Sequence, residues 1–314
     1  MLRRYLAKRL VVAIPSLLIA SLIVFTLPRL IPGDVVAMML EEKAYAKDME
    51  ELRAKLGLNR PIYVQYFEWV GRALRGDLGE SLWTRQAVLD QVAQRLPVTL
   101  TLGLEALVVA VLIGVPIGII AAVRQDGPLD FVARSGAILG LSIPAFVTSI
   151  VVILLPAIWW GWSPVTTFVR FSADPAAYAL QFVLPAVILG IASAAAIMRL
   201  TRGMLLEVLR QDYVRTAWAK GLRERVVVLK HGLKNAVIPV VTVLGLQVAQ
   251  IAGGSVIVET IFGIPGMGQF LVESIIQRDY PVIQGINLLI VVIIVTTNLL
   301  VDLTYALLDP RIRY

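Results

Sequence analysis

The sequence has no cysteine and only one histidine, His231, among its 314 residues. The first absence excludes disulfides and thiolate metal sites, and the second excludes a multi-histidine metal site built from this chain alone. Charge is also scarce, because charged residues make up 16% of the chain and apolar residues 58%. A soluble protein of this length needs more polar surface to cover itself. The composition, with a mean hydropathy of +0.80, therefore indicates a membrane protein.

A phosphate-binding loop is missing as well. The chain has no Gly-x-x-x-x-Gly-Lys-[Ser/Thr] sequence, and no glycine in it is followed by lysine. In many ATPases such a loop cradles the phosphates of ATP. Any ATP hydrolysis coupled to this chain must therefore take place on another subunit. We expect the chain to be no enzyme and to hold neither a cofactor nor a metal of its own.

Long apolar runs are what the sequence has in place of charge. A bilayer core needs about 20 apolar residues per helix, and six runs meet that length, which predicts an all-α polytopic membrane protein. The first run follows a basic start, as in a signal peptide, but it is long for that role and no clear cleavage site follows it, so we expect a retained helix. The six predicted spans are Leu10–Leu30, Val98–Val123, Gly136–Trp160, Leu180–Met198, Ala236–Ile261 and Val282–Val301.

The basic residues are distributed unevenly over the loops between these spans. The two short loops after the third and fifth spans hold only Arg170 and Arg278, whereas the loop of about residues 199–235 is strongly basic. Lysine and arginine gather on the cytoplasmic side of membrane proteins, so both termini are predicted to be cytoplasmic. The net charge of +7 then reflects topology, and we expect the bilayer, not nucleic acid, as the partner of these charges.

A short helix is predicted inside the basic loop. Asp212 is suited to cap its start, and Gly221 to take the left-handed position past its end. One apolar face, at positions i, i+3, i+4 and i+8, comprises Val214, Ala217, Trp218 and Leu222. The other faces carry Arg215, Thr216, Ala219 and Lys220. The residues alone leave two interpretations open: a helix on the membrane surface, or one that docks on a cytoplasmic partner through Trp218.

This stretch, "DYVRTAWAKGL", resembles the coupling loop of ABC importer permeases of the dipeptide/oligopeptide/nickel branch. The general motif reads Glu-Ala-Ala-x-x-x-Gly. Arg215 and Thr216 replace its first two residues while Ala217 and Gly221 match, which is the form usual in the peptide branch. The resemblance extends in order over nearly the whole chain, through "LGLNRPIYVQY", "GDLGES", "ETIFGIPGMGQFLVESIIQRDYPVIQG" and "LLDPRIR".

The resemblance implies the type I importer permease fold with six transmembrane helices. Residues 1–31 would form the N-terminus and first helix, residues 32–97 an extended external segment, and residues 98–314 a five-helix core with the coupling loop. A second permease subunit would complete the pathway, and two ATPase subunits or domains would bind ATP and Mg. A binding protein would deliver cargo outside the cytoplasmic membrane of a bacterium or archaeon. Peptides are the favoured cargo, with glutathione or nickel chelates as alternatives.

Five polar residues of the last two spans are candidates for the translocation pathway. Four are neutral, and they either line a polar cavity or join helices by hydrogen bonds: Gln247, Gln250, Asn287 and Asn298. The fifth, Glu259, is ionisable, and a charge within a span suggests function by default. Because Glu259 lies near the end of its span, the alternative is that water reaches it there.

Two functions of other classes compete with the importer. A secondary transporter driven by an ion gradient would more often show inverted repeats and several charges in mid-span, and neither is clear in this sequence. An intramembrane enzyme would need a nucleophile with its base or a metal site, for which one loop histidine without cysteine supplies little.

Overall fold

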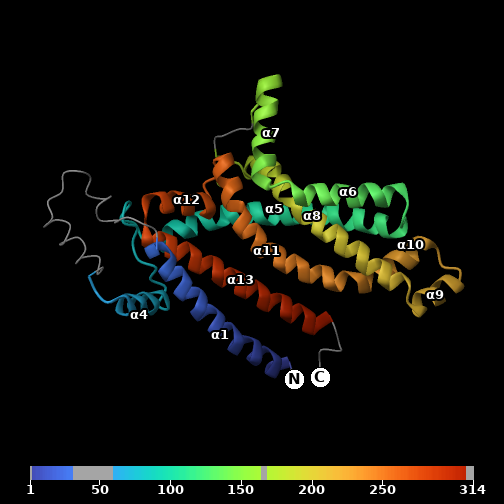
Figure 1. The fold of residues 1–314 in the computed structure, drawn as a ribbon, viewed down its shortest axis with the longest axis horizontal. Helices are drawn as coiled ribbons and strands as arrows, with labels where there is room; N and C mark the ends of the chain where they lie inside the picture. The colour runs from blue at the N-terminus through green and yellow to red at the C-terminus, as the bar shows by residue number, and fades with distance from the viewer. Residues whose placement is uncertain (1, 31–58, 164–167, 309–314) are drawn as a thin grey trace.

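The computed structural model describes residues 2–30, 59–163 and 168–308, which form a bundle of helices (Figure 1). The predicted all-α class is thus confirmed for these residues. The helices are α1 (Leu2–Thr26), α4 (Ile62–Ala73), α5 (Val88–Val123), α6 (Pro128–Ser142), α7 (Ala145–Trp160), α8 (Pro175–Leu209), α9 (Asp212–Ala219), α10 (Glu224–Val226), α11 (Lys234–Phe262), α12 (Met267–Gln277) and α13 (Tyr280–Leu308). A 3-10 turn, Leu27–Leu30, follows α1, and a π-helical segment, Val227–Leu233, joins α10 to α11.

The centre of the bundle is the close pairing of α5 with α8. A Cβ atom added to Gly114 would lie 2.7 Å from the carbonyl oxygen of Ala194, and one added to Gly118 would lie 2.8 Å from that of Met198. Side chains larger than hydrogen would force the two backbones apart, so these glycines set the distance between the helices. Near the other end of the pair, Gly190 makes the matching close approach to α5.

The third predicted span is broken in the structure. Proline lacks an N–H and disfavours helical backbone at the preceding residue. Accordingly α6 ends at Ser142, Ile143 is extended, and α7 begins after Pro144. The axes of α6 and α7 meet at 93°. In Figure 1, α7 stands away from the rest of the bundle. The predicted span Gly136–Trp160 is therefore bent at Pro144 and divided between α6 and α7.

The number of membrane crossings depends on how such bent pairs are counted. By length and composition, four helices of the described residues could each cross a membrane, and bent pairs raise the number to as many as seven. The predicted total of six lies between these counts. Besides α6 with α7, the bent pairs include the end of α11 with α12, which meet at 86°.

The predicted external segment is described from residue 59 onward. Its sequence predicts helices at Glu50–Gly57 and Pro61–Arg75, and the second of these is confirmed as α4. Phe25 of α1 packs against Tyr66 and Trp69 of α4, and the guanidinium of Arg29 lies 3.6 Å from the centre of the Phe25 ring. The first predicted helix of this segment, at residues 50–57, lies outside the described residues. Aromatic packing thus fastens α4 to the end of α1.

The bundle has two distinct ends (Figure 1). The helices α4 and α12 lie at one end, and α9 and α10 lie at the other. The helices α1 and α13 run side by side in opposite directions, and the start of α1 and the end of α13 both point away from the end that carries α4 and α12. The predicted external segment and the predicted cytoplasmic loop are therefore separated by the length of the bundle.

Candidate functional site

Helix α9 contains seven of the predicted coupling residues, and the other three, Lys220, Gly221 and Leu222, follow it directly. Gln211 is its N-cap, with extended backbone and no capping side chain. Asp212 is the first helical residue, its side chain is 97% exposed, and its Oδ1 lies 3.5 Å from Nη1 of Arg215. The prediction that Asp212 caps the helix is therefore wrong. The helix begins one residue earlier than predicted, which moves the carboxylate out of the capping position.

The predicted apolar face of α9 divides into a buried and an exposed part. Val214 and Ala217 are buried against Val227 of the π-helical segment, with Leu222 packed beside them. Trp218 is instead 44% exposed, as is Tyr213. Residues of an α-helix are spaced by about 100°. The direction that faces the core lies midway between Val214 and Ala217. Tyr213 lies about 70° to one side of this direction, and Trp218 lies about 70° to the other side. The prediction of one apolar face that includes both Trp218 and the buried pair is thus only partly correct.

Gly221 has the conformation that its position predicts. Its φ is +74°, and its N–H donates to the carbonyl oxygen of Trp218 at 2.9 Å. No heavy atom lies within 4 Å of the place where a Cβ would sit. Glycine is therefore required here by its backbone angles and not by crowding.

The exposed surface of α9 is a small platform fixed from below. Asn235 of α11 donates to the Tyr213 hydroxyl at 2.7 Å, and that hydroxyl donates to the carbonyl oxygen of His231 at 3.2 Å. Together with the buried Val214, these contacts hold α9 in one orientation. Its outward side carries two half-exposed aromatic rings and a set of exposed residues: Arg215, Thr216, Ala219 and Lys220. Exposed aromatic side chains on a fixed helix are suitable anchors for a protein partner.

The predicted pathway residues whose side chains are described each make separate contacts. Gln247 is buried, and its side-chain oxygen accepts from the Ser193 hydroxyl at 3.2 Å, which joins α11 to α8. Asn287 donates to the carbonyl oxygen of Ile283 in its own helix at 2.8 Å, and Asn298 is exposed. The side chain of Gln250 lies outside the described residues. Of the two alternatives left open, helix joining fits Gln247.

Glu259 is fully buried and caps the start of α12. Its Oε2 accepts from the N–H groups of Gly268 and Gln269 at 2.7 and 3.1 Å. Its Oε1 accepts from the Thr99 hydroxyl at 2.9 Å, and Thr99 in turn accepts from the N–H of Met267 at 2.8 Å. A carboxylate at a helix N-terminus satisfies free N–H groups and opposes the positive end of the helix dipole. Glu259 thus joins α11 and α12 to α5.

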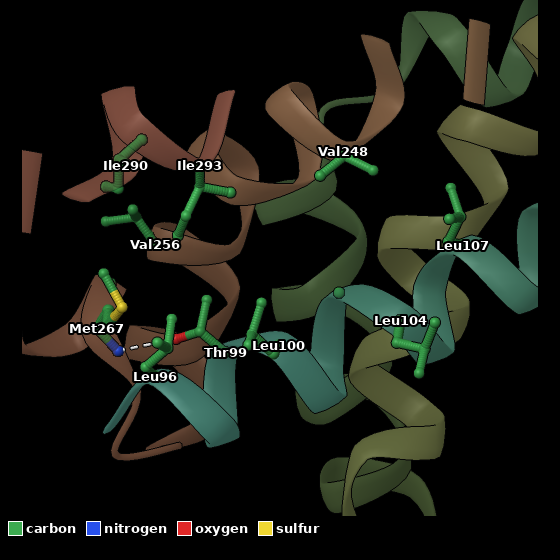
Figure 2. A pocket seen from close by; sticks show the side chains of 12 residues that line it. Leu96, Thr99, Leu100, Leu104, Leu107, Val248, Val256, Met267, Ile290 and Ile293 are labelled. Atoms are coloured by element: carbon green, nitrogen blue, oxygen red, sulfur yellow. Dashed lines mark hydrogen bonds between the residues drawn. The ribbon is translucent and has the colours of Figure 1, made fainter. Parts of the chain in front are cut away.

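An apolar cavity of about 190 Å³ lies beside this junction. Figure 2 shows it between α5 and the segments of α11, α12 and α13, with the hydrogen bond from Met267 to Thr99 at one end. The described predicted pathway residues are not among those that line it. Six apolar side chains make up much of the wall: Leu96, Leu100, Leu104, Val256, Ile290 and Ile293. The cavity can accommodate an apolar group, and Thr99 provides a polar contact at its edge.

The "GDLGES" turn is latched to the connection between α12 and α13. The hydroxyl of Ser81 donates to Oδ2 of Asp279 at 2.5 Å, and the N–H of Leu82 donates to its Oδ1 at 3.2 Å. The indole of Trp83 donates to the carbonyl oxygen of Gln277 at 2.8 Å. Burial raises the pKa of Asp279 above its usual range, and the hydrogen bonds from Ser81 and Leu82 partly oppose that shift. Nothing in the sequence indicated this pairing, because its members lie 198 residues apart.

Among the described residues, no group of three or more histidine, aspartate and glutamate side chains could hold a metal ion.

Comparison with known proteins places the whole chain among membrane transport components. Residues 114–314 match the model of the binding-protein-dependent transport system inner membrane component, and residues 1–103 match the model of its N-terminal region. A probable peptide ABC transporter permease of Sinorhizobium fredii is 40% identical over 99% of both chains. The glutathione transport system permease GsiC of Escherichia coli K12 is 42% identical over 99% of both. A putative peptide transport system permease of Brucella melitensis is 38% identical over the full length of both.

Proposed function

The chain belongs to the family of binding-protein-dependent transport system inner membrane components, and we propose that it is a permease subunit of an ATP-driven importer that carries peptides. The observation that carries this proposal is the full-length similarity to peptide and glutathione permeases. Glutathione is the second candidate cargo, since the relative GsiC is named for its transport. The same class of machine serves both cargoes.

Helix α9 is the proposed contact with an ATPase subunit. Trp218 and Tyr213 would enter a groove on the ATPase, and Gly221 would let the chain turn sharply after the helix. Two ATPase subunits or domains would bind ATP and Mg, because this chain has no phosphate-binding loop. Closure of the ATPase pair would displace α9 and so turn ATP hydrolysis into a rigid-body movement of the helices.

The remaining parts of the machine follow from this arrangement. A second permease subunit would complete the pathway, and a binding protein would deliver cargo to the end that carries α4 and α12. The separation of α4 and α12 from α9 along the bundle supports opposite sides of the membrane for these elements (Figure 1). We assign residues 1–31 to the N-terminus and first helix, 32–97 to the external segment, and 98–314 to the core, with both termini in the cytoplasm.

Transport by the reconstituted complex tests the function. The permease, its ATPase and its second permease are placed in liposomes with the binding protein and a radiolabelled dipeptide or glutathione. We expect uptake that needs ATP and persists when ionophores collapse ion gradients. Uptake driven by a gradient without ATP would instead identify a secondary transporter. The purified chain alone should hydrolyse no ATP above background.

Cysteine labelling tests the orientation, because the native chain has no cysteine to interfere. Lys220 and Arg75 are exposed residues from the two ends of the bundle. A thiol introduced at position 75 should react with an impermeant reagent from outside the cell, and one at position 220 should react only after the membrane is opened. The reverse pattern would overturn the topology.

A further inference from the structure

A buried ion pair joins α6 to α8 two turns before the end of α8. Asp130, in the first turn of α6, accepts from Nε of Arg202 at 2.6 Å and from its Nη2 at 2.7 Å. The Asp130 side chain is fully buried, and that of Arg202 is 18% exposed. Asp130 also accepts from the N–H of Asp126 at 2.9 Å. One carboxylate therefore binds both the turn between α5 and α6 and the side of α8.

Beyond this pair, α6 packs on α8 through small residues: a Cβ added to Gly140 would lie 3.3 Å from Cγ2 of Ile191 and 3.7 Å from Cβ of Ala195. An apolar groove of about 420 Å³ runs between α5, α6 and α8. The buried contact between α6 and α8 is the small cluster of Ala137, Ala195 and Met198. A two-point guanidinium–carboxylate contact is directional as well as strong. Apolar packing lacks this directionality, so Asp130 and Arg202 add a directional link to the packed contact between these two helices.

The same helix α8 is in contact with α9. Val214 and Ala217 of α9 lie in one apolar cluster with Val208 and Leu209 in the last turn of α8. Arg202 precedes Leu209 by seven residues, which is about 10 Å along a helix. A displacement of α9 is thus passed to the end of α8 and reaches Arg202 within two turns.

We propose that the pair Asp130–Arg202 is the linkage through which displacement of α9 moves α6 and, beyond the bend at Pro144, α7. The glycine contacts already fix α5 to α8, and the pair fixes the start of α6 to α8 and to the turn after α5. Asp130 and Arg202 are positioning residues, since they act through the helices and not on the cargo. Buried ion pairs are weak sources of stability but can fix one arrangement among several. The inference rests on the proposed function, in which an ATPase drives α9.

Distance measurements on the assembled importer test the linkage directly. Spin labels are placed on cysteines introduced at Trp160 in α7 and Arg75 at the external end, and in a second sample at Lys220 after α9 and Arg75. All three positions are exposed. When Asp130 and Arg202 are unaltered, we expect both distances to change when the importer is trapped in its ATP-bound state. In the double variant Asp130→Asn/Arg202→Gln, the distance from α9 should still change, whereas the distance from α7 should not.

The double variant removes both charges together, so neither is left buried without its partner. We expect it to retain ATPase copurification and ATP hydrolysis while uptake per ATP falls at least tenfold. The matched control is Arg199→Gln, which removes an exposed charge from the same helix one turn earlier and should leave every readout unchanged. If the double variant fails to fold, Arg202→Lys keeps the charge but loses the two-point contact, and it should reduce the α7 movement by itself.

Normal α7 movement and normal uptake per ATP in a folded double variant, or in Arg202→Lys where that variant replaces it, would overturn the proposal. So would an α7 that stays still in the unaltered importer while α9 moves and transport proceeds. Failure of the unaltered chain to bind an ATPase is a different result, because it refutes the proposed function itself.

Discussion

The two ends of the molecule hold their buried carboxylates in different ways. At the end near α9, Asp130 is paired with the positive charge of Arg202. At the opposite end, Glu259 and Asp279 accept hydrogen bonds from neutral hydroxyl and backbone N–H groups of the described residues. These neutral contacts fix both ends of α12 to other elements. Contacts within the chain thus hold α12 in place at its end of the bundle.

At the end near α9, contacts within the chain leave the outer side of the helix exposed. Val214 fixes α9 from below, but the aromatic rings of Tyr213 and Trp218 remain 44% exposed on its outer side. Aromatic residues on a fixed helix at the proposed cytoplasmic end suit a protein partner. Contacts within the chain hold α12, whereas α9 leaves two aromatic rings half-exposed, as the proposed docking surface requires.

Loss of the Glu259 carboxylate should have the largest effect. The variant Glu259→Ala leaves the Thr99 hydroxyl and the N–H groups of Gly268 and Gln269 without their acceptor. Each buried group left unsatisfied costs about 1–3 kcal/mol, so we expect a loss of stability on the order of 3 kcal/mol or more. The thermal denaturation midpoint of the purified protein in detergent measures it.

The control for this prediction lies on α12 itself. Glu273 is exposed and accepts from the side chain of Gln269 at 3.0 Å. The variant Glu273→Ala should change the midpoint little, because water replaces an exposed hydrogen bond. Equal midpoints for the two variants would show that the cap does not hold α12, and the contrast between the ends would fail on its α12 side.

Truncation of Trp218 should affect partner binding without affecting stability. Loss of an aromatic anchor at an interface typically costs about 2 kcal/mol or more, so Trp218→Ala should weaken ATPase association on the order of tenfold or more. The thermal midpoint should stay the same, because Trp218 is only half-buried in the chain. Copurification of the ATPase with the tagged permease, alongside uptake in the same cells, measures the first effect.

Two further variants separate anchoring from local structure. Gly221→Val places a β-branched residue at a φ of +74°, which strains the backbone by roughly 1–2 kcal/mol and should also reduce ATPase binding. Val214→Ala, inside the buried cluster, should lower the thermal midpoint instead. If Trp218→Ala and Gly221→Val both retain normal ATPase binding and uptake, α9 is a helix on the membrane surface and the coupling assignment is wrong.

The Asp279 latch should make stability depend on pH. The pKa of Asp279 is raised above 3.8 by burial, so the folded protein binds a proton over a pH range in which the unfolded chain has released it. The contribution of Asp279 to stability is therefore fully present below pH 3.8 and is lost as pH rises through the folded pKa. Midpoints measured upward from about pH 4 should fall more steeply for the native chain than for Asp279→Asn. Equal slopes would contradict the burial of this carboxyl.

The sequence predicts much of the fold but few of the side-chain contacts between helices. Apolar runs locate the long helices, and Gly221 and the α4 segment are found from local residue preferences. The errors arise at boundaries: a shift of one residue removes Asp212 from the capping position, and Pro144 signals a break without giving the 93° angle. Local patterns carry this information because each element depends on neighbouring residues.

The missed contacts join residues far apart along the chain. Asp130 and Arg202 are 72 residues apart, Thr99 and Glu259 are 160 apart, and Ser81 and Asp279 are 198 apart. Apart from Glu259, each of these side chains looks ordinary in its local stretch. Glu259 stands out only as a charge near a span, which suggests function in general and not a helix cap. Only the folded structure shows which of these residues are in contact.

The smallest effect should come from the exposed basic residues near α9. Arg223 is exposed and makes no side-chain hydrogen bond with the described residues. An exposed ion pair formed with a partner is worth roughly 0–1 kcal/mol, so Arg223→Ala should reduce ATPase copurification by less than about fivefold, and raising the salt concentration should shrink that difference further. The effect of Trp218→Ala should persist at high salt, because burial of an aromatic ring does not depend on screening. If Arg223→Ala instead matches Trp218→Ala and both effects vanish in salt, charge and not the aromatic platform holds the partner, and the α9 end would depend on electrostatic attraction rather than on an anchoring residue.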